Sequence, residues 1–120
     1  MARYVDGFVI PVPKKNLATY RRMARSAAKL WKELGALEVR ECVIEDAKSP
    51  GVMTFARVLK LKPRETVIFS WITFKSRRDR DRINAKVMKD PRMSKMMSPG
   101  AMPFDVRRMV YGGFSVIVDL

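Results

Sequence analysis

Two polar side chains lie within otherwise apolar segments and are candidates for acid–base chemistry. Asp6 lies between Val5 and Gly7, where apolar surroundings would make its carboxylate more basic and suit it to act as a general base. Tyr111 lies in a second apolar segment and could donate a hydrogen bond to a bound molecule. Each has an ordinary alternative: Asp6 as a surface or turn-bonded carboxylate, and Tyr111 as core or interface packing.

Further side chains could form a binding site for a small, flat molecule. The ligand-binding candidates are Phe69, Trp71, Phe104, Arg40 and Asn84. The rings would line a cavity, Asn84 would hold a carbonyl, and Arg40 would clamp an anion with Glu41 as a base. In the alternative interpretation the rings are ordinary packing, Asn84 is solvated, and Arg40 and Glu41 point to opposite faces of a strand. The methionines at 93, 96, 97 and 102 suit an adaptable lid or a loop packed on a partner.

Residue content excludes several kinds of chemistry. The chain has no histidine and one cysteine, Cys42, so it has neither a Ser-His-Asp nor a Cys-His arrangement, nor a cluster of thiolate and imidazole metal ligands. Gly112 and Gly113 lack the spacing of a dinucleotide-binding loop. We therefore expect no metal and no cofactor. Cofactor-independent oxidation or isomerisation stays open, because the protein would only need to bind, deprotonate and exclude water.

The chain is strongly basic, with 25 lysines and arginines against 12 acidic residues and a net charge of +13 in 120 residues. Residues 1–60 carry 12 basic and 6 acidic side chains, and residues 61–120 carry 13 and 6, so there is no basic tail. Two predicted helices hold many of these cations. They could form a polyanion-binding surface, or they could simply be solvated helix faces. Nucleic acid is not expected as a partner, because the aromatic stacking motif of RNA-recognition domains is absent from the third strand.

The chain predicts a β-α-β, insert, β-α-β order in a single domain over residues 1–120. Strands are predicted over residues 3–10, 37–44, 66–74 and 109–118, and helices over residues 14–34 and 77–89. Pro11 and Pro13 should end the first strand, Gly35 the first helix, and Ser76 should cap the second helix. Residues 53–61 fit a strand or a helical turn, and residues 92–105 fit a long loop or lid. Two such half-repeats form an α+β ferredoxin-like fold with a four-stranded antiparallel sheet.

Three of the predicted strands are apolar on both faces. In residues 66–74, Phe69 and Trp71 point one way while Ile72 and Phe74 point the other. Two helices can cover only one face, and the other would expose more apolar area than a soluble monomer usually does. We therefore expect a homodimer in which two sheets pack face to face. An apolar ligand or the segment 92–105 are the alternative covers.

Three long strings resemble a family of small uncharacterised bacterial proteins, the YbaA-like family. They are YVDGFVIPVP from Tyr4, FSWITFKSRRDRDRINAKVMKDPRM from Phe69 and MPFDVRRMVYGGFSVIVDL from Met102. The resemblance runs from Tyr4 to Leu120 and implies membership of the dimeric α/β-barrel superfamily, with cofactor-less monooxygenases and stress-responsive barrel proteins as distant relatives. It also implies a ligand cavity between sheet and helices in each protomer. The charge of +13 departs from the family pattern.

Together these features predict a protein that binds a small hydrophobic or aromatic metabolite in a protomer cavity. Its catalytic form would be a cofactor-independent monooxygenase or isomerase, with Asp6 and Tyr111 in the site and Phe69, Trp71, Tyr111 and Phe104 lining the cavity. The alternatives are a non-catalytic, stress-related ligand-binding protein and a polyanion-binding module. No apolar run approaches the ~20 residues of a membrane span, and the N-terminus does not look like a secretory signal. We therefore expect a cytoplasmic protein without membrane contact.

Overall fold

A computed structural model describes residues 1–98 and 100–120 of the chain. Its strands are β1 (Tyr4–Pro13), β2 (Glu38–Val43), β3 (Glu65–Phe74) and β4 (Val110–Ser115). Its α-helices are α1 (Leu17–Leu34), α2 (Phe55–Val58), α3 (Arg77–Lys89) and α4 (Pro91–Met96), and two 3₁₀ turns are η1 (Lys14–Asn16) and η2 (Val106–Arg108). The undecided segment 53–61 therefore contains a short helix, α2, whose Thr54 side chain accepts a hydrogen bond from the Arg57 backbone N–H.

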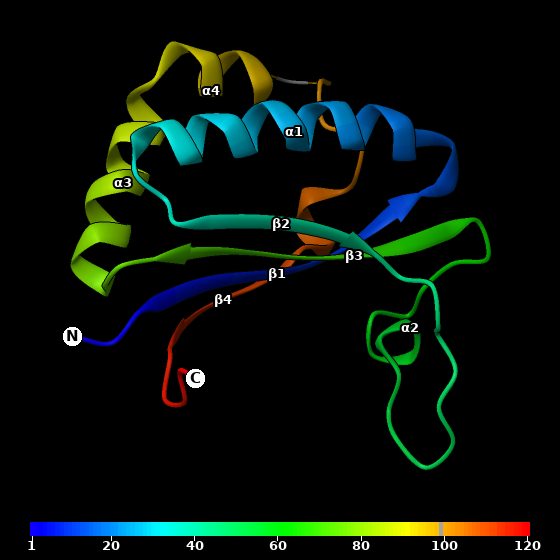
Figure 1. Cartoon of the computed structure of the whole chain (residues 1–120). Helices are drawn as coiled ribbons and strands as arrows, with labels where there is room; N and C mark the ends of the chain where they lie inside the picture. Colours follow the sequence, from blue (N-terminus) through cyan, green and yellow to red (C-terminus); the bar gives the residue numbers. More distant parts are fainter. Residues whose placement is uncertain (99) are drawn as a thin grey trace.

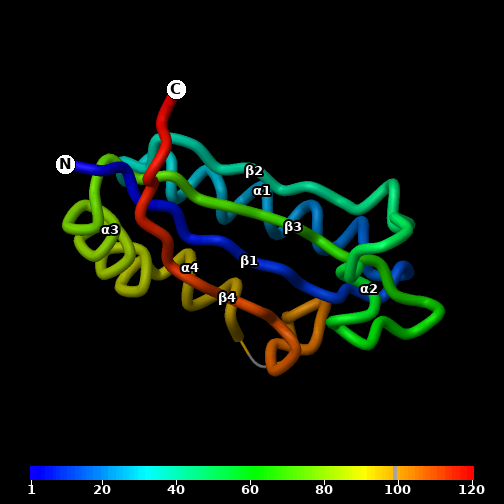
Figure 2. Tube along the Cα trace, turned by 90° about the horizontal axis from the view of Figure 1, so that it is seen from below, coloured from blue at the N-terminus to red at the C-terminus, as the bar shows by residue number. Residues whose placement is uncertain are grey.

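The four strands form one antiparallel sheet in the order β2-β3-β1-β4. The helices α1, α3 and α4 lie on one side of it, called here the helix face, while α2 lies below the other side, the open face (Figure 1). Seen from below, the strands cross the molecule in this order (Figure 2). This arrangement confirms the predicted α+β, ferredoxin-like fold.

The first strand is longer than predicted, because β1 continues through Pro11 and Pro13. Strand β4 stops pairing with β1 at Val9, so the β4 side of β1 is an edge beyond that point. The Lys14 N–H donates to the Arg64 carbonyl on the β3 side at 2.8 Å. Because backbone directions alternate, Pro11 and Pro13 turn their nitrogens to the edge, where no N–H is needed.

The two helix boundaries agree closely with the sequence signals. Helix α1 ends at Gly35, which has a φ of +121° that favours glycine. Helix α3 begins after Ser76, whose side chain accepts a hydrogen bond from the Asp79 N–H at 3.2 Å. The buried core lies between these helices and the sheet. One cluster includes Leu30, Ile72, Phe74, Ile83, Val87 and Met93, and the other Ile10, Val12, Tyr20, Ala24 and Ile68.

The segment 92–105 was expected to be a long loop or lid, but its first part is helical. Asp90 caps α4 by accepting from the Arg92 N–H, and Pro91 occupies the first turn, where a missing N–H costs nothing. Met93 is buried with the helix-face core. This segment therefore packs on the helix face through α4, and its described residues do not cover the open face. Residue 99 lies outside the described residues.

The open face carries apolar side chains that are largely uncovered. Phe69, Val110 and Phe114 are 45%, 51% and 58% exposed, respectively. At one end, α2 covers part of the face: Val67 is buried, and the Phe55 ring lies 6.1 Å from the Phe69 ring. Among the described residues, no helix is long and apolar enough to cross a membrane.

Candidate functional site

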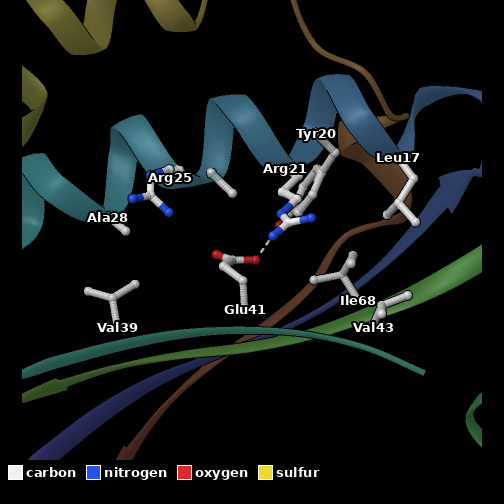
Figure 3. Close-up of a pocket in the computed structure, with 10 residues that line it drawn as sticks. Leu17, Tyr20, Arg21, Arg25, Ala28, Val39, Glu41, Val43 and Ile68 are labelled. Atoms are coloured by element: carbon white, nitrogen blue, oxygen red, sulfur yellow. Dashed lines mark hydrogen bonds between the residues drawn. The ribbon is translucent and has the colours of Figure 1, made fainter. Parts of the chain in front are cut away.

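A cleft with a volume of about 460 Å³ lies between α1 and the edge strand β2 (Figure 3). It is lined by Leu17, Tyr20, Arg21, Ala24, Arg25, Ala28, Val39, Glu41, Val43 and Ile68. The side chains that hang from α1 face those that rise from β2, so the cleft runs along the helix axis (Figure 3). Its lining is mainly apolar, with one carboxylate and two guanidinium groups.

The local sequence explains why α1 and β2 leave a space between them. Ala24 and Ala28 are four residues apart and present only methyl groups toward the strand. On β2, alternate residues face the helix, which puts Val39, Glu41 and Val43 in the cleft. Small helix residues opposite a strand at the edge of the sheet therefore leave the volume unfilled.

A hydrogen bond between Tyr20 and Glu41 is the polar centre of the cleft. The Tyr20 hydroxyl donates to Glu41 Oε1 at 2.6 Å, and the Tyr20 side chain is buried, with the Phe104 ring edge-on at 5.7 Å. Burial is the main cause that raises the pKa of Glu41, and hydrogen bonds from the Tyr20 and Ser70 hydroxyls oppose it. Burial and the adjacent carboxylate raise the pKa of Tyr20, so its phenol stays protonated.

Burial of Glu41 differs between its backbone and its carboxylate. The residue as a whole is exposed, because β2 is an edge strand. Its carboxylate nevertheless points under α1 toward Tyr20 (Figure 3). The acid is thus accessible from solvent at the mouth of the cleft while its inner oxygen is held by a buried donor.

Two arginines of α1 line the same cleft as this acid. Arg21 and Arg25 are one helical turn apart on α1 and line the cleft together with Glu41 (Figure 3). Both are exposed along their length, so their charged ends stay hydrated. This end of the cleft can attract an anionic group.

A second, smaller cavity of about 140 Å³ continues beneath α1. It shares Tyr20, Ala24, Ala28, Val39 and Glu41 with the cleft. Its remaining walls are Phe8, Ile10, Met23, Ala27, Trp31, Ser70, Ile72, Phe104 and Met109. A ligand with an apolar body could therefore extend inward past the Tyr20–Glu41 pair.

The structure brings three of the predicted site residues together away from this cleft. Asp6 is 1% exposed, and its carboxylate accepts hydrogen bonds from Tyr111 at 2.9 Å and Asn84 at 3.2 Å. Arg80 of α3 lies 3.8 Å from the same carboxylate, and the Trp31 indole N–H donates to the Asn84 side-chain oxygen at 3.0 Å. Both carboxylate oxygens of Asp6 therefore connect β1 to side chains of β4 and α3.

The predicted cavity lined jointly by Phe69, Trp71, Tyr111 and Phe104 is not formed. Phe69 and Trp71 point to the open face, whereas Phe104 lies under α1 on the helix face. Side chains alternate across a sheet, so residues 69 and 71 cannot share a helix-face cavity with Ile68 and its neighbours. The two rings contact each other at 5.5 Å, and the Trp71 N–H donates to Glu38 at 2.8 Å.

Arg40 and Glu41 do not form a joint anion clamp and base. They point to opposite faces, as the alternative interpretation stated, and Arg40 lies 3.7 Å from the Glu38 carboxylate on the open face. No local signal predicts the pairing of Tyr20 with Glu41, because Tyr20 lies among the apolar residues of the predicted helix over residues 14–34. Among the residues that the structure describes, no group of three acidic or cysteine side chains could hold a metal.

Comparisons with known proteins agree with the resemblance predicted from the three strings. A model of the family described as "Protein of unknown function (DUF1428)" matches residues 3–106. The "Uncharacterized protein YbaA" of Escherichia coli strain K12 is 46% identical over 117 residues, which cover 98% of each chain. The protein of the same name from Shigella flexneri has the same identity and coverage.

One solved structure supports the fold independently of sequence. A dimeric ferredoxin-like protein from an uncultured marine organism superposes with a TM-score of 0.64, covers 100% of both chains and is 9% identical. At this identity the likeness concerns the fold. The family match and the end-to-end similarity to YbaA lead to one conclusion: this chain belongs to the DUF1428 family of proteins of unknown function.

Proposed function

We propose that this protein is a homodimer that binds a small apolar or aromatic molecule in the cleft between α1 and β2. The observation that carries the proposal is a cleft of about 460 Å³ whose apolar walls surround the Tyr20–Glu41 hydrogen bond. Ligand sites typically have about 300–1,000 Å³ and a few convergent polar groups within apolar lining. The inner cavity beneath α1 adds room for a ring, with Phe104 and Trp31 in its wall.

The homodimer is supported by the open face. Phe69, Val110 and Phe114 are each about half exposed, and a contiguous patch of this kind is usually covered in a soluble protein. The structural neighbour is described as dimeric and ferredoxin-like. Two sheets packed face to face would bury on the order of 1,500 Å², and the cleft, on the opposite side of the sheet, would stay accessible.

Calorimetric titration with two aromatic probes tests the ligand site. We expect saturable binding of 2-naphthoate or 2-naphthol to the wild-type protein. Ala28→Trp should abolish it by filling the cleft, whereas Ala18→Trp, on the exposed side of the same helix, should not. No saturable binding of either probe below about 1 mM, a range typical of weak ligands, or equal binding by Ala28→Trp, would argue against the cleft.

Sedimentation equilibrium tests the homodimer. The wild-type protein should sediment as a dimer at micromolar concentration. Phe69→Glu should sediment as a monomer, because it places a charge in the proposed sheet-to-sheet interface. Met88→Glu, at an exposed apolar position of α3, is the matched control and should stay dimeric. A monomeric wild-type protein would contradict the pairing.

Polyanion binding is the second candidate, favoured by a cationic groove next to the cleft. Arg25, Lys29 and Lys32 of α1 line it with Arg40 of β2, against a single acid, Glu33. Fluorescence anisotropy with a labelled single-stranded oligonucleotide should then report binding at ~50 mM salt that weakens steeply by ~200 mM. Absence of binding at the lower salt concentration excludes this candidate.

A further inference from the structure

We propose that the cleft enolises an apolar 2-oxo acid, with Glu41 as the general base that removes and returns a proton at the carbon beside the ketone. This inference rests on the proposed ligand site and adds a substrate class and a reaction to it. It follows from three features of one small volume: an acid at the mouth, a buried phenol that holds it, and two arginines in the lining of the same cleft.

Glu41 is the one acidic side chain in the lining of the cleft. Its neighbours on the walls, Val39, Val43 and Ile68, are aliphatic, so a substrate that fills the cleft would displace water from around the carboxylate. Burial already raises the pKa of Glu41, which makes the ionised form a stronger base than an ordinary surface glutamate. The position of Glu41 and its basicity therefore both suit a general base.

Tyr20 acts as a positioning residue. Its hydroxyl donates to Glu41 Oε1 at 2.6 Å, and its ring is held by burial and by the Phe104 edge at 5.7 Å. A short hydrogen bond from a fixed donor limits the rotation of a carboxylate on an otherwise exposed strand. The acid therefore has a defined direction toward the interior of the cleft.

Arg21 and Arg25 define the charge of the substrate. Two guanidinium groups, one helical turn apart and lining the same cleft as the base, suit a carboxylate. They also favour the extra negative charge that appears on the substrate oxygen when the proton leaves. The aliphatic walls and the inner cavity would take the apolar or aromatic side chain.

The step balances without an oxidant, a reductant or a cofactor. One C–H bond of the methylene group breaks, and its proton forms an O–H bond with Glu41. The C–H electron pair becomes a C=C bond, while the carbonyl π pair moves to the ketone oxygen. Return of the proton to that oxygen gives the enol, and return to the carbon restores the keto acid.

Proton nuclear magnetic resonance in D₂O measures this step directly. Phenylpyruvate, an aromatic 2-oxo acid, should lose its benzylic proton signal faster with wild-type protein than in buffer alone. Glu41→Gln should slow the protein-dependent exchange at least about a hundredfold, which is the usual contribution of a general base. Glu45→Gln, an exposed acid just beyond β2 and outside the cleft, is the matched control and should exchange like the wild type.

The pH profile of the exchange rate distinguishes a positioning role of Tyr20 from a purely structural role. The charged and titratable groups that line the cleft with Glu41 are Tyr20, Arg21 and Arg25, all from α1. On the neighbouring strand β3, Ser70 is the residue paired with Glu41. The Tyr20 hydrogen bond lowers the pKa of Glu41. Tyr20→Phe should therefore move the inflection of the exchange rate to higher pH, whereas a purely structural defect would lower the rate at every pH.

The outcomes distinguish this inference from the ligand site on which it rests. If the wild-type protein binds 2-naphthoate but exchanges phenylpyruvate at the buffer rate, enolisation is refuted and binding stands. If Glu41→Gln is folded by circular dichroism and exchanges like the wild type, Glu41 is not the base. If neither probe binds and no exchange occurs, both proposals fail.

Discussion

Replacing Asp6 by asparagine should destabilise the fold through an unpaired cation. In the wild-type protein, the Asp6 carboxylate lies 3.8 Å from an Arg80 guanidinium nitrogen, and their side chains are 2% and 16% exposed, respectively. Asparagine keeps the shape and can still accept from the Tyr111 hydroxyl, but it removes the charge and puts an NH2 group in place of the oxygen that accepts from Asn84. A double-mutant cycle with Arg80→Met therefore separates the electrostatic pairing of β1 with α3 from the lost Asn84 hydrogen bond.

The size of the effect depends on the contacts that Arg80 retains in the Asp6→Asn variant. Breaking a buried ion pair by removing one partner costs about 3–5 kcal/mol. Arg80 retains the Asp81 carboxylate at 3.1 Å and stacks 4.8 Å above the Tyr4 ring, so we expect a loss at or below the lower limit of this range, about 2–3 kcal/mol. Arg80→Met should cost more, because the acid that it leaves behind is almost fully buried.

Urea denaturation at pH 7 measures these free energies of unfolding. All variants must be compared at one protomer concentration, because the stability of the proposed dimer would depend on it. The variant that combines Asp6→Asn with Arg80→Met should be about 2 kcal/mol more stable than the sum of the two single losses predicts. Asp81→Asn, the exposed partner of the same arginine at 59% side-chain exposure, is the matched control and should cost less than about 1 kcal/mol.

Two results would refute this reasoning. One is an Asp6→Asn variant within about 0.5 kcal/mol of the wild type, the usual range for a harmless surface change. The other is simple additivity of Asp6→Asn and Arg80→Met. The same variant also tests the predicted catalytic role of Asp6: a folded Asp6→Asn protein that no longer exchanges phenylpyruvate would favour Asp6 over Glu41 as the base.

Two further predictions concern other parts of the fold. Arg108 hydrogen-bonds Glu65 and lowers its pKa, so the pair stabilises the protein above the ordinary glutamate pKa of 4.5 and loses this effect as pH falls. Glu65→Gln should cost about 1–2 kcal/mol at pH 7 and little at pH 3, and equal losses at both values would contradict the pairing. Gly113→Ala would put a Cβ 2.5 Å from the Tyr4 hydroxyl oxygen; a drop in melting temperature is expected, and none would mean that Tyr4 moves freely.

The fold could largely be predicted from local patterns. The run of β-branched and aromatic residues in 66–74 and the apolar residues spaced three and four apart along 14–34 predict a strand and a helix directly. Gly35 and Ser76 mark helix ends through backbone requirements that act locally. The alternation of side-chain direction along a strand correctly divided Phe69 and Trp71 from Ile72 and Phe74. The predicted end of β1 before Pro11 was wrong, because a proline interrupts a strand only where its nitrogen faces a neighbouring strand. The extent of pairing with β4 decides this, and β4 does not reach Pro11.

The site depended on contacts between distant residues. Tyr20 and Glu41 are 21 residues apart, and Asp6 and Tyr111 are 105 apart; nothing in the local pattern indicates that these side chains meet. Phe69 and Trp71 were grouped with Phe104 by residue type, although strand alternation already put them on another face than Ile68.

What residue order alone establishes here is the four strands and the two long helices, the apolar faces of the sheet and the absence of histidine chemistry, because each is a property of neighbouring residues or of composition. The cleft exists only in three dimensions. It forms because two alanines of α1 happen to lie across from the edge strand β2, and its polar centre forms because packing brings one phenol to one carboxylate.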